Sequence, residues 1–355
     1  MKKILIPVIC LLVFFHTSVF AQEITTQIEG EDFFNSSVTE LAKGDFSLSP
    51  GRILDYIYKI LTDEFNSSKK LVMCIFIIAL ISGIFSVVKQ GDNSANNVSF
   101  FVCYCLITIA SAKLVTVSVG YGTDVIEEMS TFITKLAPLL SMLLAAGGYT
   151  SSAAVFYPVF SSSVYLISTV IEKCIVPLIY ISCVIGIVNN LSGKSQLNNF
   201  NKIIKSFSRW ILAAILTIFS GINAIYGFCT PSLDSLGMKT AKFAIGSIVP
   251  VVGGFLSESI ETVIGSTRLM KNAVGTAGII SLIVICAVPV IKTAAIMLML
   301  KISAAVIEPV SDKRFSDMLM EVADAVTTVF AMLIIASVLF IISIAIIIST
   351  TNVTM

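Results

Sequence analysis

The sequence predicts an all-α protein, a polytopic bundle of transmembrane helices. Of its 355 residues, 56% are hydrophobic and only 13% are charged, and the mean hydropathy is +0.96. Soluble domains carry about 25% charged residues. Several apolar runs also reach the about 20 residues that a helix needs to cross a bilayer. A composition this apolar, arranged in runs of that length, indicates an integral membrane protein.

The composition also argues against several classes of function. The only histidine is His16, so the commonest general base and metal ligand is nearly absent. The sequence has no P-loop, HExxH, GxSxG or GxGxxG motif, and its eight cysteines form no CxxC pair. A net charge of +1 gives no argument for nucleic acid as a partner. We therefore expect no enzyme activity, no cofactor, no metal site and no nucleic-acid partner.

The first residues resemble an export signal. Lys2 and Lys3 precede the apolar run Ile4–Phe20, and Ala21 completes a cleavage pattern. This predicts a cleavable signal peptide over residues 1–21, with an uncleaved membrane anchor as the alternative. Residues 22–70 are polar and form the expected exported segment. Within it, Arg52–Phe65 has the apolar spacing of an amphipathic helix, which would pack on its own membrane domain, on the membrane surface or on a partner.

Residues 71–355 are expected to form the membrane domain, with about eight spans. Loop charges give an orientation, because Lys and Arg favour the cytoplasmic side. The loop Asn190–Arg209 carries basic and no acidic residues, so we expect it to be cytoplasmic, whereas the acidic loop Tyr121–Thr131 is expected outside. The expected spans are Leu71–Val88, Val98–Gly120, Phe132–Gly148, Ala153–Ile171, Cys174–Asn189, Trp210–Gly227, Ala273–Ile291 and Thr327–Ser349.

One stretch, Phe243–Gly278, differs from a simple span. A proline and two glycines interrupt its apolar part, and an amphipathic charged part follows. The pattern is typical of a broken element that lines a cavity, so we expect a re-entrant segment over Phe243–Leu256 and an interfacial helix, together covering residues 243–272. Its charges either serve a path or gate, or snorkel and pair structurally. The candidate residues are Pro250, Gly253, Gly254, Glu258, Glu261, Arg268, Lys271 and Asn272.

Two further features have more than one interpretation. The segment opening at Ser311 has an apolar stripe against acidic residues, and could dock a partner through Asp312, Lys313 and Arg314 or anchor the bundle. The middle spans are rich in Ser, Ala and Gly, as in SMLLAAGGYTSSAAVF. Small residues allow close helix packing, while a serine-rich span could instead line a polar path.

Three pieces of the sequence resemble the stage III sporulation protein AE family of endospore-forming bacteria. They are KLAPLLSMLLAAGGYTSSAAVFYP (Lys135–Pro158), GSIVPVVGGFLSESIETVIGSTRLMKNAVGTAG (Gly246–Gly278) and SDKRFSDML (Ser311–Leu319). The signal peptide, polar segment and multispan body follow in the order seen in that family. The resemblance extends over nearly the whole chain.

The resemblance implies a multi-pass protein of the cell membrane, in the mother-cell membrane around the forespore. It implies a permease-like channel or platform subunit of a secretion complex that joins the two cells. The implied partners are other stage III proteins, namely a cytoplasmic ATPase, ring-forming membrane proteins and a forespore-membrane partner. The alternatives are a secondary permease for a small molecule and an assembly scaffold that moves nothing. The sequence leaves the substrate, the topology after residue 227 and homo-oligomerisation open.

Overall fold

The computed structural model describes residues 93–192, 197–248, 253–309 and 311–350, with a few residues between 62 and 81. Within these ranges, side chains are described except at 93–97, 99, 192, 227–261, 263 and 350. The predicted signal peptide and nearly all of the predicted exported segment lie outside the described residues. In chain order the helices are α4 (Asn93–Ala146), α5 (Thr150–Val170), the π-helical turn η1 (Ile171–Ile175), α6 (Val176–Ser192), α7 (Asn198–Ile248), α8 (Gly253–Ile307) and α9 (Lys313–Thr350).

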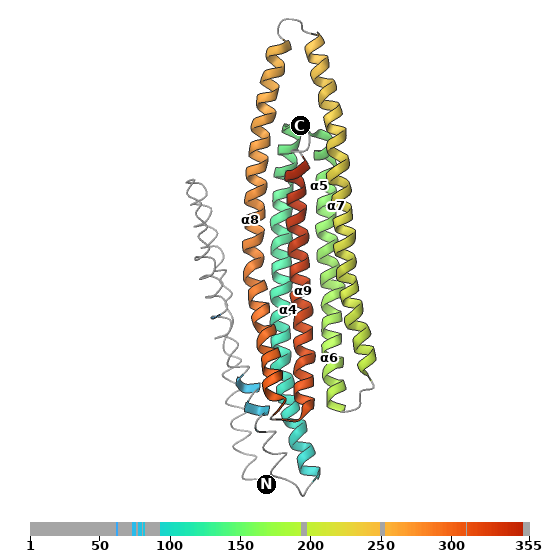
Figure 1. Ribbon diagram of the computed structural model, residues 1–355, viewed down its shortest axis with the longest axis vertical. Coiled ribbons are helices and arrows are strands. Elements are labelled where there is room, and N and C mark those ends of the chain that lie inside the picture. The colour runs from blue at the N-terminus through green and yellow to red at the C-terminus, as the bar shows by residue number, and fades with distance from the viewer. Residues whose placement is uncertain are drawn as a thin grey trace. The chain divides into compact units, whose positions relative to one another are not determined.

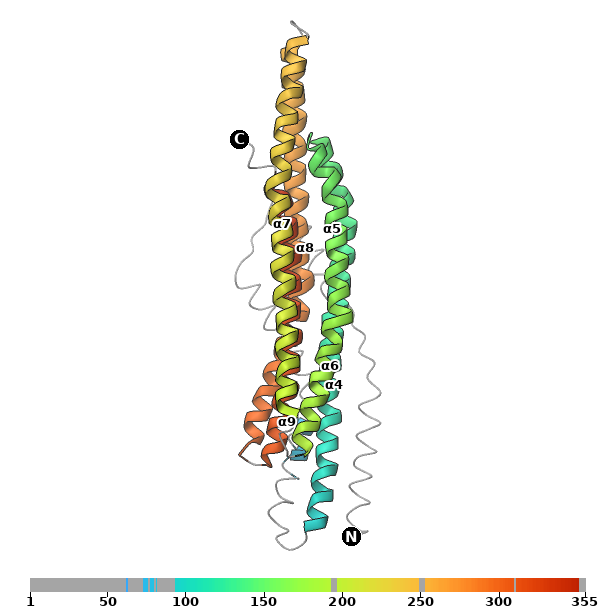
Figure 2. The same cartoon turned by 90° about the vertical axis from the view of Figure 1, so that its right-hand side faces the viewer.

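The described part of the chain is a bundle of long antiparallel helices, which confirms the predicted all-α class. The chain runs along α4, returns through α5, η1 and α6, and then passes up α7, down α8 and up α9 (Figures 1 and 2). Among the described residues, five helices are long and apolar enough to cross a membrane. The protein is therefore a multi-pass membrane protein by the length and composition of its helices.

The reversal between α4 and α5 uses the glycine pair in the small-residue segment. Gly148 has φ 83°, a left-handed conformation that glycine adopts without strain. The Tyr149 N–H donates to the Leu144 carbonyl at 3.0 Å, which closes the end of α4. In the next helix, Ser152 and Ala153 are buried, and the Ser141 hydroxyl donates to the Ala153 carbonyl at 3.0 Å. The described contacts of this segment are therefore those of close helix packing.

The last helix, α9, is the centre of the bundle. It packs against α8 over the most extensive interface and also contacts α4, α6 and α7. Its apolar window has a mean hydropathy of 3.1, and 50% of that window is buried inside the protein, more than in any other of the five helices. Burying apolar side chains from several sides stabilises a bundle through dense packing. Fully buried α9 residues include Phe315, Met318, Leu319, Val322, Val326, Val329, Met332, Leu333, Ala336, Leu339, Phe340 and Ile344.

The expected spans fall on fewer, longer helices than the sequence suggested. Residues Tyr121–Thr131, expected as a loop, are helical and continue α4, so that expectation was wrong. The physical reason is packing, because Val125 and Met129 in this segment are buried. A Cβ atom at Gly122 would lie 2.8 Å from the Met332 Cε, so glycine here permits α4 to approach α9 closely. In the same way, Ala153–Ile171 and Cys174–Asn189 form one helical column through η1.

The described residues on either side of the predicted break belong to two long helices. Phe243–Ile248 is the end of α7, and Gly253 is the first residue of α8. The described part therefore shows a junction between two helices where the sequence suggested a re-entrant segment, and the interfacial helix is the first part of α8 and not an element of its own. Proline and glycine end helices as readily as they interrupt them, so the sequence pattern fits both arrangements. Pro250 lies outside the described residues.

Helices α7 and α8 are longer than the hydrocarbon core of a bilayer is thick. α8 has 55 residues and α7 has 51. At a rise of 1.5 Å per residue, a helix of this size is about 80 Å long, more than twice the about 30 Å hydrocarbon core. The end of α7 and the start of α8 both extend past the ends of α5 and α9 (Figures 1 and 2). A large part of these two helices must therefore lie outside the hydrocarbon.

Candidate functional site

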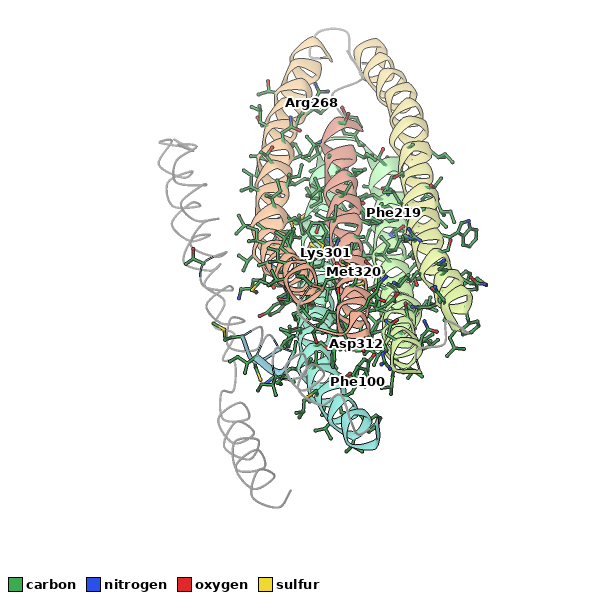
Figure 3. All side chains as sticks on the ribbon, turned by 60° about the horizontal axis from the view of Figure 1, so that its bottom comes forward. Phe100, Phe219, Arg268, Lys301, Asp312 and Met320 are labelled. Atoms are coloured by element: carbon green, nitrogen blue, oxygen red, sulfur yellow. The ribbon has the colours of Figure 1, made fainter. Side chains whose placement is uncertain are left out.

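The predicted site residues on α8 that the structure describes are Arg268, Lys271 and Asn272. They lie near the end of α9, far from Asp312 at the other end of that helix, as the positions of Arg268 and Asp312 in Figure 3 show. Gly253 and Gly254 open α8. The side chains of Glu258 and Glu261 lie outside the described ones. The structure therefore brings three of the predicted residues together and separates them from the Asp312 group.

Lys271 is a buried cation that holds the end of α9. Only 1% of its surface is exposed. Its Nζ donates to the carbonyl oxygens of Ile347 at 3.0 Å and Ile348 at 3.1 Å. The last carbonyls of a helix have no partner within the helix and carry its negative partial charge, so a lysine there satisfies both needs. Lys271 thus ties α8 to the C-terminal turn of α9.

Arg268 makes the neighbouring contact, one helical turn earlier. Its Nη2 donates to the Tyr149 hydroxyl at 3.0 Å, which joins α8 to the turn between α4 and α5. Within the described residues its buried Nε has no hydrogen-bond partner, and neither has the buried Oδ1 of Asn272. Most buried polar atoms in proteins have a hydrogen-bond partner, so these two atoms are exceptions. This group, Tyr149, Arg268, Lys271 and Asn272, is called the anchor cluster below.

Two glycines continue the anchor cluster along α8. A Cβ at Gly275 would lie 2.5 Å from the Ile348 Cγ1, and one at Gly278 would lie 2.7 Å from the Leu136 Cδ2. Real Cβ atoms almost never approach other atoms so closely. A side chain at Gly275 would displace the branched Ile348, whereas at Gly278 the end of the Leu136 side chain would have to move. Lys271, Gly275 and Gly278 thus form one stripe on which α8 lies against its neighbours.

The face of this segment that packs into the bundle includes a lysine. Thr267 and Lys271, one turn apart on the same helical face, are both buried. Leu269 and Met270 are 72% and 58% exposed. Helical spacing shows which side chains share a face but does not say whether that face meets water, lipid or the carbonyl end of another helix. The contacts described for Arg268 and Lys271 are contacts between helices of the bundle.

Asp312, Lys313 and Arg314 form the N-terminal turn of α9. The Asp312 Oδ1 accepts a hydrogen bond from the Arg314 backbone N–H at 2.9 Å, as an N-cap residue does. The Arg314 Nη2 also donates to the Asp312 Oδ2 at 3.1 Å, and its guanidinium lies 4.1 Å from the centre of the Phe100 ring. Burial would raise the pKa of Asp312, but the hydrogen bonds and charge of Arg314 outweigh it and lower that pKa. Two of the three predicted docking residues thus bond to each other, while Lys313 is exposed.

A polar network between α6, α7 and α9 was missed by sequence reasoning. The Lys205 Nζ lies 2.8 Å from the Glu321 Oε2 and 2.8 Å from the Asp324 Oδ2. The Asn201 Nδ2 donates to the same Glu321 oxygen at 2.7 Å, and the Ser182 hydroxyl donates to the Asn201 Oδ1 at 2.8 Å. These five residues are called the α7–α9 network below. It holds two carboxylates against one lysine.

Helices α6 and α9 lie close together beside this network. A Cβ at Gly186 would lie 2.7 Å from the Glu321 Oε2, so glycine lets α6 reach α9 at this point. The sequence did contain a signal, since Glu321 and Asp324 stand three residues apart on one face of a helix. That face looks like a surface face in the sequence. Its partner, Lys205, lies 119 residues from Asp324 in the chain.

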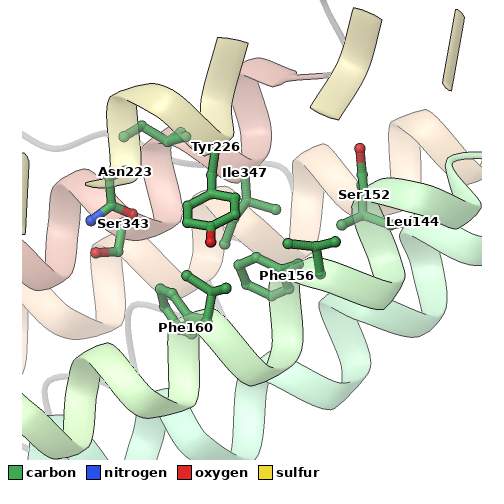
Figure 4. A pocket seen from close by; sticks show the side chains of 11 residues that line it. Leu144, Ser152, Phe156, Phe160, Asn223, Tyr226, Ser343 and Ile347 are labelled. Carbon is green, nitrogen blue, oxygen red and sulfur yellow. The ribbon is translucent and has the colours of Figure 1, made fainter. Parts of the chain in front are cut away.

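A small cavity lies between α4, α5, α7 and α9 (Figure 4). Its volume is about 50 Å³, and it is lined by phenylalanines with a few polar groups such as Asn223 and Ser343. One water molecule needs about 10–15 Å³ of such volume, so the cavity has room for a few waters. In the part of the chain that the structure describes, no group of His, Cys, Asp and Glu side chains could hold a metal ion.

Comparison with known proteins identifies the family. The model of the family described as stage III sporulation protein AE matches residues 33–351. A protein named stage III sporulation protein AE from Bacillus subtilis (strain 168) is 30% identical over 321 residues, which cover 90% of this chain and 80% of that protein. No solved structure matches the chain. The multi-pass helical bundle and the match over nearly all of its length together show that the chain belongs to the stage III sporulation protein AE family.

Proposed function

We propose that this protein is a non-enzymatic membrane platform subunit of the channel-like secretion complex that joins mother cell and forespore, and that it is needed for endospore formation. Its place is the mother-cell membrane around the forespore. Its partners are a cytoplasmic ATPase, ring-forming membrane proteins and a forespore-membrane protein, all of stage III sporulation. Membership in a sporulation family and the multi-pass bundle support this proposal.

The packing of α9 favours a platform over a self-contained permease. A permease needs a path near the middle of its own bundle, between helices that can separate. Here the middle is filled by α9, whose buried side chains are apolar and tightly enclosed. The about 50 Å³ cavity beside it is too small for a metabolite. A path for larger cargo would therefore run between this subunit and its neighbours in the complex.

The junction between α7 and α8 is the proposed contact with those neighbours. The two helices extend past the rest of the bundle and end at the junction, which contains Gly253 and Gly254. The anchor cluster fixes the base of this extension, because Arg268 and Lys271 join α8 to the α4–α5 turn and to α9. Glu258 and Glu261 belong to the first turns of α8, and Pro250 precedes α8 in the sequence.

Cysteine accessibility in the assembled complex tests the proposal. In a functional variant without native cysteines, single cysteines at Ala325 and Ala336, both buried in α9, are expected to resist a membrane-impermeant maleimide. A cysteine at Thr131, which is exposed on α4, serves as the matched control. Rapid labelling of both α9 positions in the folded complex would place a water-filled path inside one subunit and contradict the platform.

Two further measurements address the partners and the permease. Native purification from sporulating cells is expected to recover the ATPase and the ring-forming proteins with this chain, and their absence from a stable complex would contradict the proposed partnership. Purified alone in vesicles, the chain is expected to transport no small solutes. Substrate uptake that depends on an ion gradient would favour the secondary permease.

A further inference from the structure

The first turns of α7 present two adjacent rows of side chains away from the bundle. One row is apolar and aromatic, with Phe200, Ile203, Phe207 and Trp210 at 54%, 64%, 50% and 67% exposure. The other is basic, with Lys202 and Arg209 exposed two turns apart. The spacing of both rows follows the helical repeat, so the six side chains share one broad face. This set is called the basic–aromatic face below.

The opposite side of the same turns is fixed to the protein. Asn201, Ile204, Ser208 and Leu212 are buried there. Asn201 and the neighbouring Lys205 bind the carboxylates of α9 in the α7–α9 network. The helix therefore cannot rotate to bury its aromatic row. The rings of Phe207 and Trp210 stack at 6.3 Å with an angle of 13°, which makes a flat apolar surface.

The electrostatics of the face favour an anionic partner. The stretch Asn190–Arg209 contains four basic residues and no acidic one. Of these, Lys205 is neutralised by Glu321 and Asp324. Lys202 and Arg209 form no ion pair within the described part of the chain. Two unneutralised cations thus flank the aromatic row.

The sequence that follows locates this face relative to a bilayer. Trp210–Leu233 contains no charged residue, and as a helix it is about 36 Å long, enough to cross a hydrocarbon core of about 30 Å. Tryptophan, lysine and arginine are enriched where such a segment meets the headgroups. The change from basic and aromatic to uncharged occurs between Arg209 and Trp210.

We propose that the basic–aromatic face binds the phosphate headgroups of anionic phospholipids. Lys202 and Arg209 contact the phosphates, and the rings of Phe207 and Trp210 lie at the boundary between headgroups and acyl chains. The bound leaflet is the one beside the connection between α6 and α7. The contact sets the depth at which α7 enters the membrane. Through the α7–α9 network it also sets the depth of α9.

The single tryptophan of the chain makes the test direct, because Trp210 is its own reporter. The full-length protein is placed in phosphatidylcholine vesicles, and fluorescence is measured as brominated phosphatidylglycerol or brominated phosphatidylcholine replaces the unlabelled lipid. Bromine quenches tryptophan only at close range. We expect brominated phosphatidylglycerol to quench Trp210 at several-fold lower mole fraction than brominated phosphatidylcholine, and this preference to fall as salt is added.

Charge variants decide whether the face itself is responsible. Each neutralised cation is expected to weaken the preference for the anionic lipid about fivefold, so the double variant K202Q/R209Q should lose it. The control K135Q/K173Q neutralises two other exposed lysines, on α4 and η1, and should keep it. Equal quenching by both lipids in the parent protein would overturn the proposal, as would an unchanged preference in K202Q/R209Q. Absence of quenching by either lipid would show that protein covers the face and would also overturn it.

Discussion

The α7–α9 network gives the sharpest prediction about stability, through the substitution Lys205→Met. Methionine matches much of the lysine stem but removes the charge, so Glu321 and Asp324 lose the cation that both contact at 2.8 Å. The side chains of Lys205, Glu321 and Asp324 are 18%, 25% and 45% exposed, so these charges in the α7–α9 network are partly accessible to solvent. We therefore expect this substitution to be destabilising.

The magnitude follows from two limits. Removing one partner of a fully buried ion pair costs about 3–5 kcal/mol, while an exposed pair contributes about 0–1 kcal/mol. The partial exposure of Glu321 and Asp324 places Lys205→Met between these limits, at about 2 kcal/mol. The substitution E321Q keeps an oxygen that accepts the Asn201 hydrogen bond. In the E321Q background, K205M should cost about 1 kcal/mol less.

The assay is unfolding in uncharged detergent micelles, followed by circular dichroism. The matched control is K202M, at an exposed lysine one turn before Lys205, which should change stability by less than about 0.5 kcal/mol. Uncharged detergent removes any contribution of lipid headgroups. If K205M and K202M unfold alike, or if the effects of K205M and E321Q simply add, the network does not hold α7 to α9.

Three further predictions concern the other regions. Gly275→Leu should destabilise the protein by about 1–3 kcal/mol, because its side chain would collide with α9, whereas Gly265→Leu, with no atom within 4 Å of the added Cβ, should change little; equal unfolding midpoints would refute the close packing. Asp312→Ala should cost about 1 kcal/mol at neutral pH through loss of the N-cap. The folded protein lowers the pKa of Asp312, so the stability that this carboxylate contributes is fully present above the ordinary pKa of about 4 and is lost as the pH falls through the lower folded pKa. The difference in stability between parent and variant should therefore vanish in acid. A constant difference in unfolding midpoint across that pH range would contradict this prediction. Replacing Gly253 and Gly254 with leucine should abolish sporulation while membrane insertion, measured by fractionation, persists; heat-resistant spores at normal yield would argue against a role for the junction.

The sequence alone determined the class of protein and its family. Long uncharged apolar runs are local properties, and they predict membrane helices whatever their neighbours are. The segments around Gly147, Pro250 and Asp312 were sufficient to indicate the family, which the comparison confirms. The role of glycine as a breaker was only partly predictable. Gly148 does end a helix, but Gly122, Gly275 and Gly278 lie inside helices where neighbours approach closely.

Only the tertiary structure decided which polar residues meet. Helical spacing places Glu321 and Asp324 on a polar face, and it places Lys271 with Ile264 and Thr267 on an apolar face. Neither pattern says whether a side chain meets water, a helix end or a cation. Lys271 meets carbonyls 76 residues away, and Asp324 meets a lysine 119 residues away. The expectation of a loop at Tyr121–Thr131 was wrong for the same reason. The charges of this segment suggested a surface loop, whereas its buried residues hold α4 against α9 as part of a helix. Partners so distant in the chain are brought together by packing, which local periodicity does not contain.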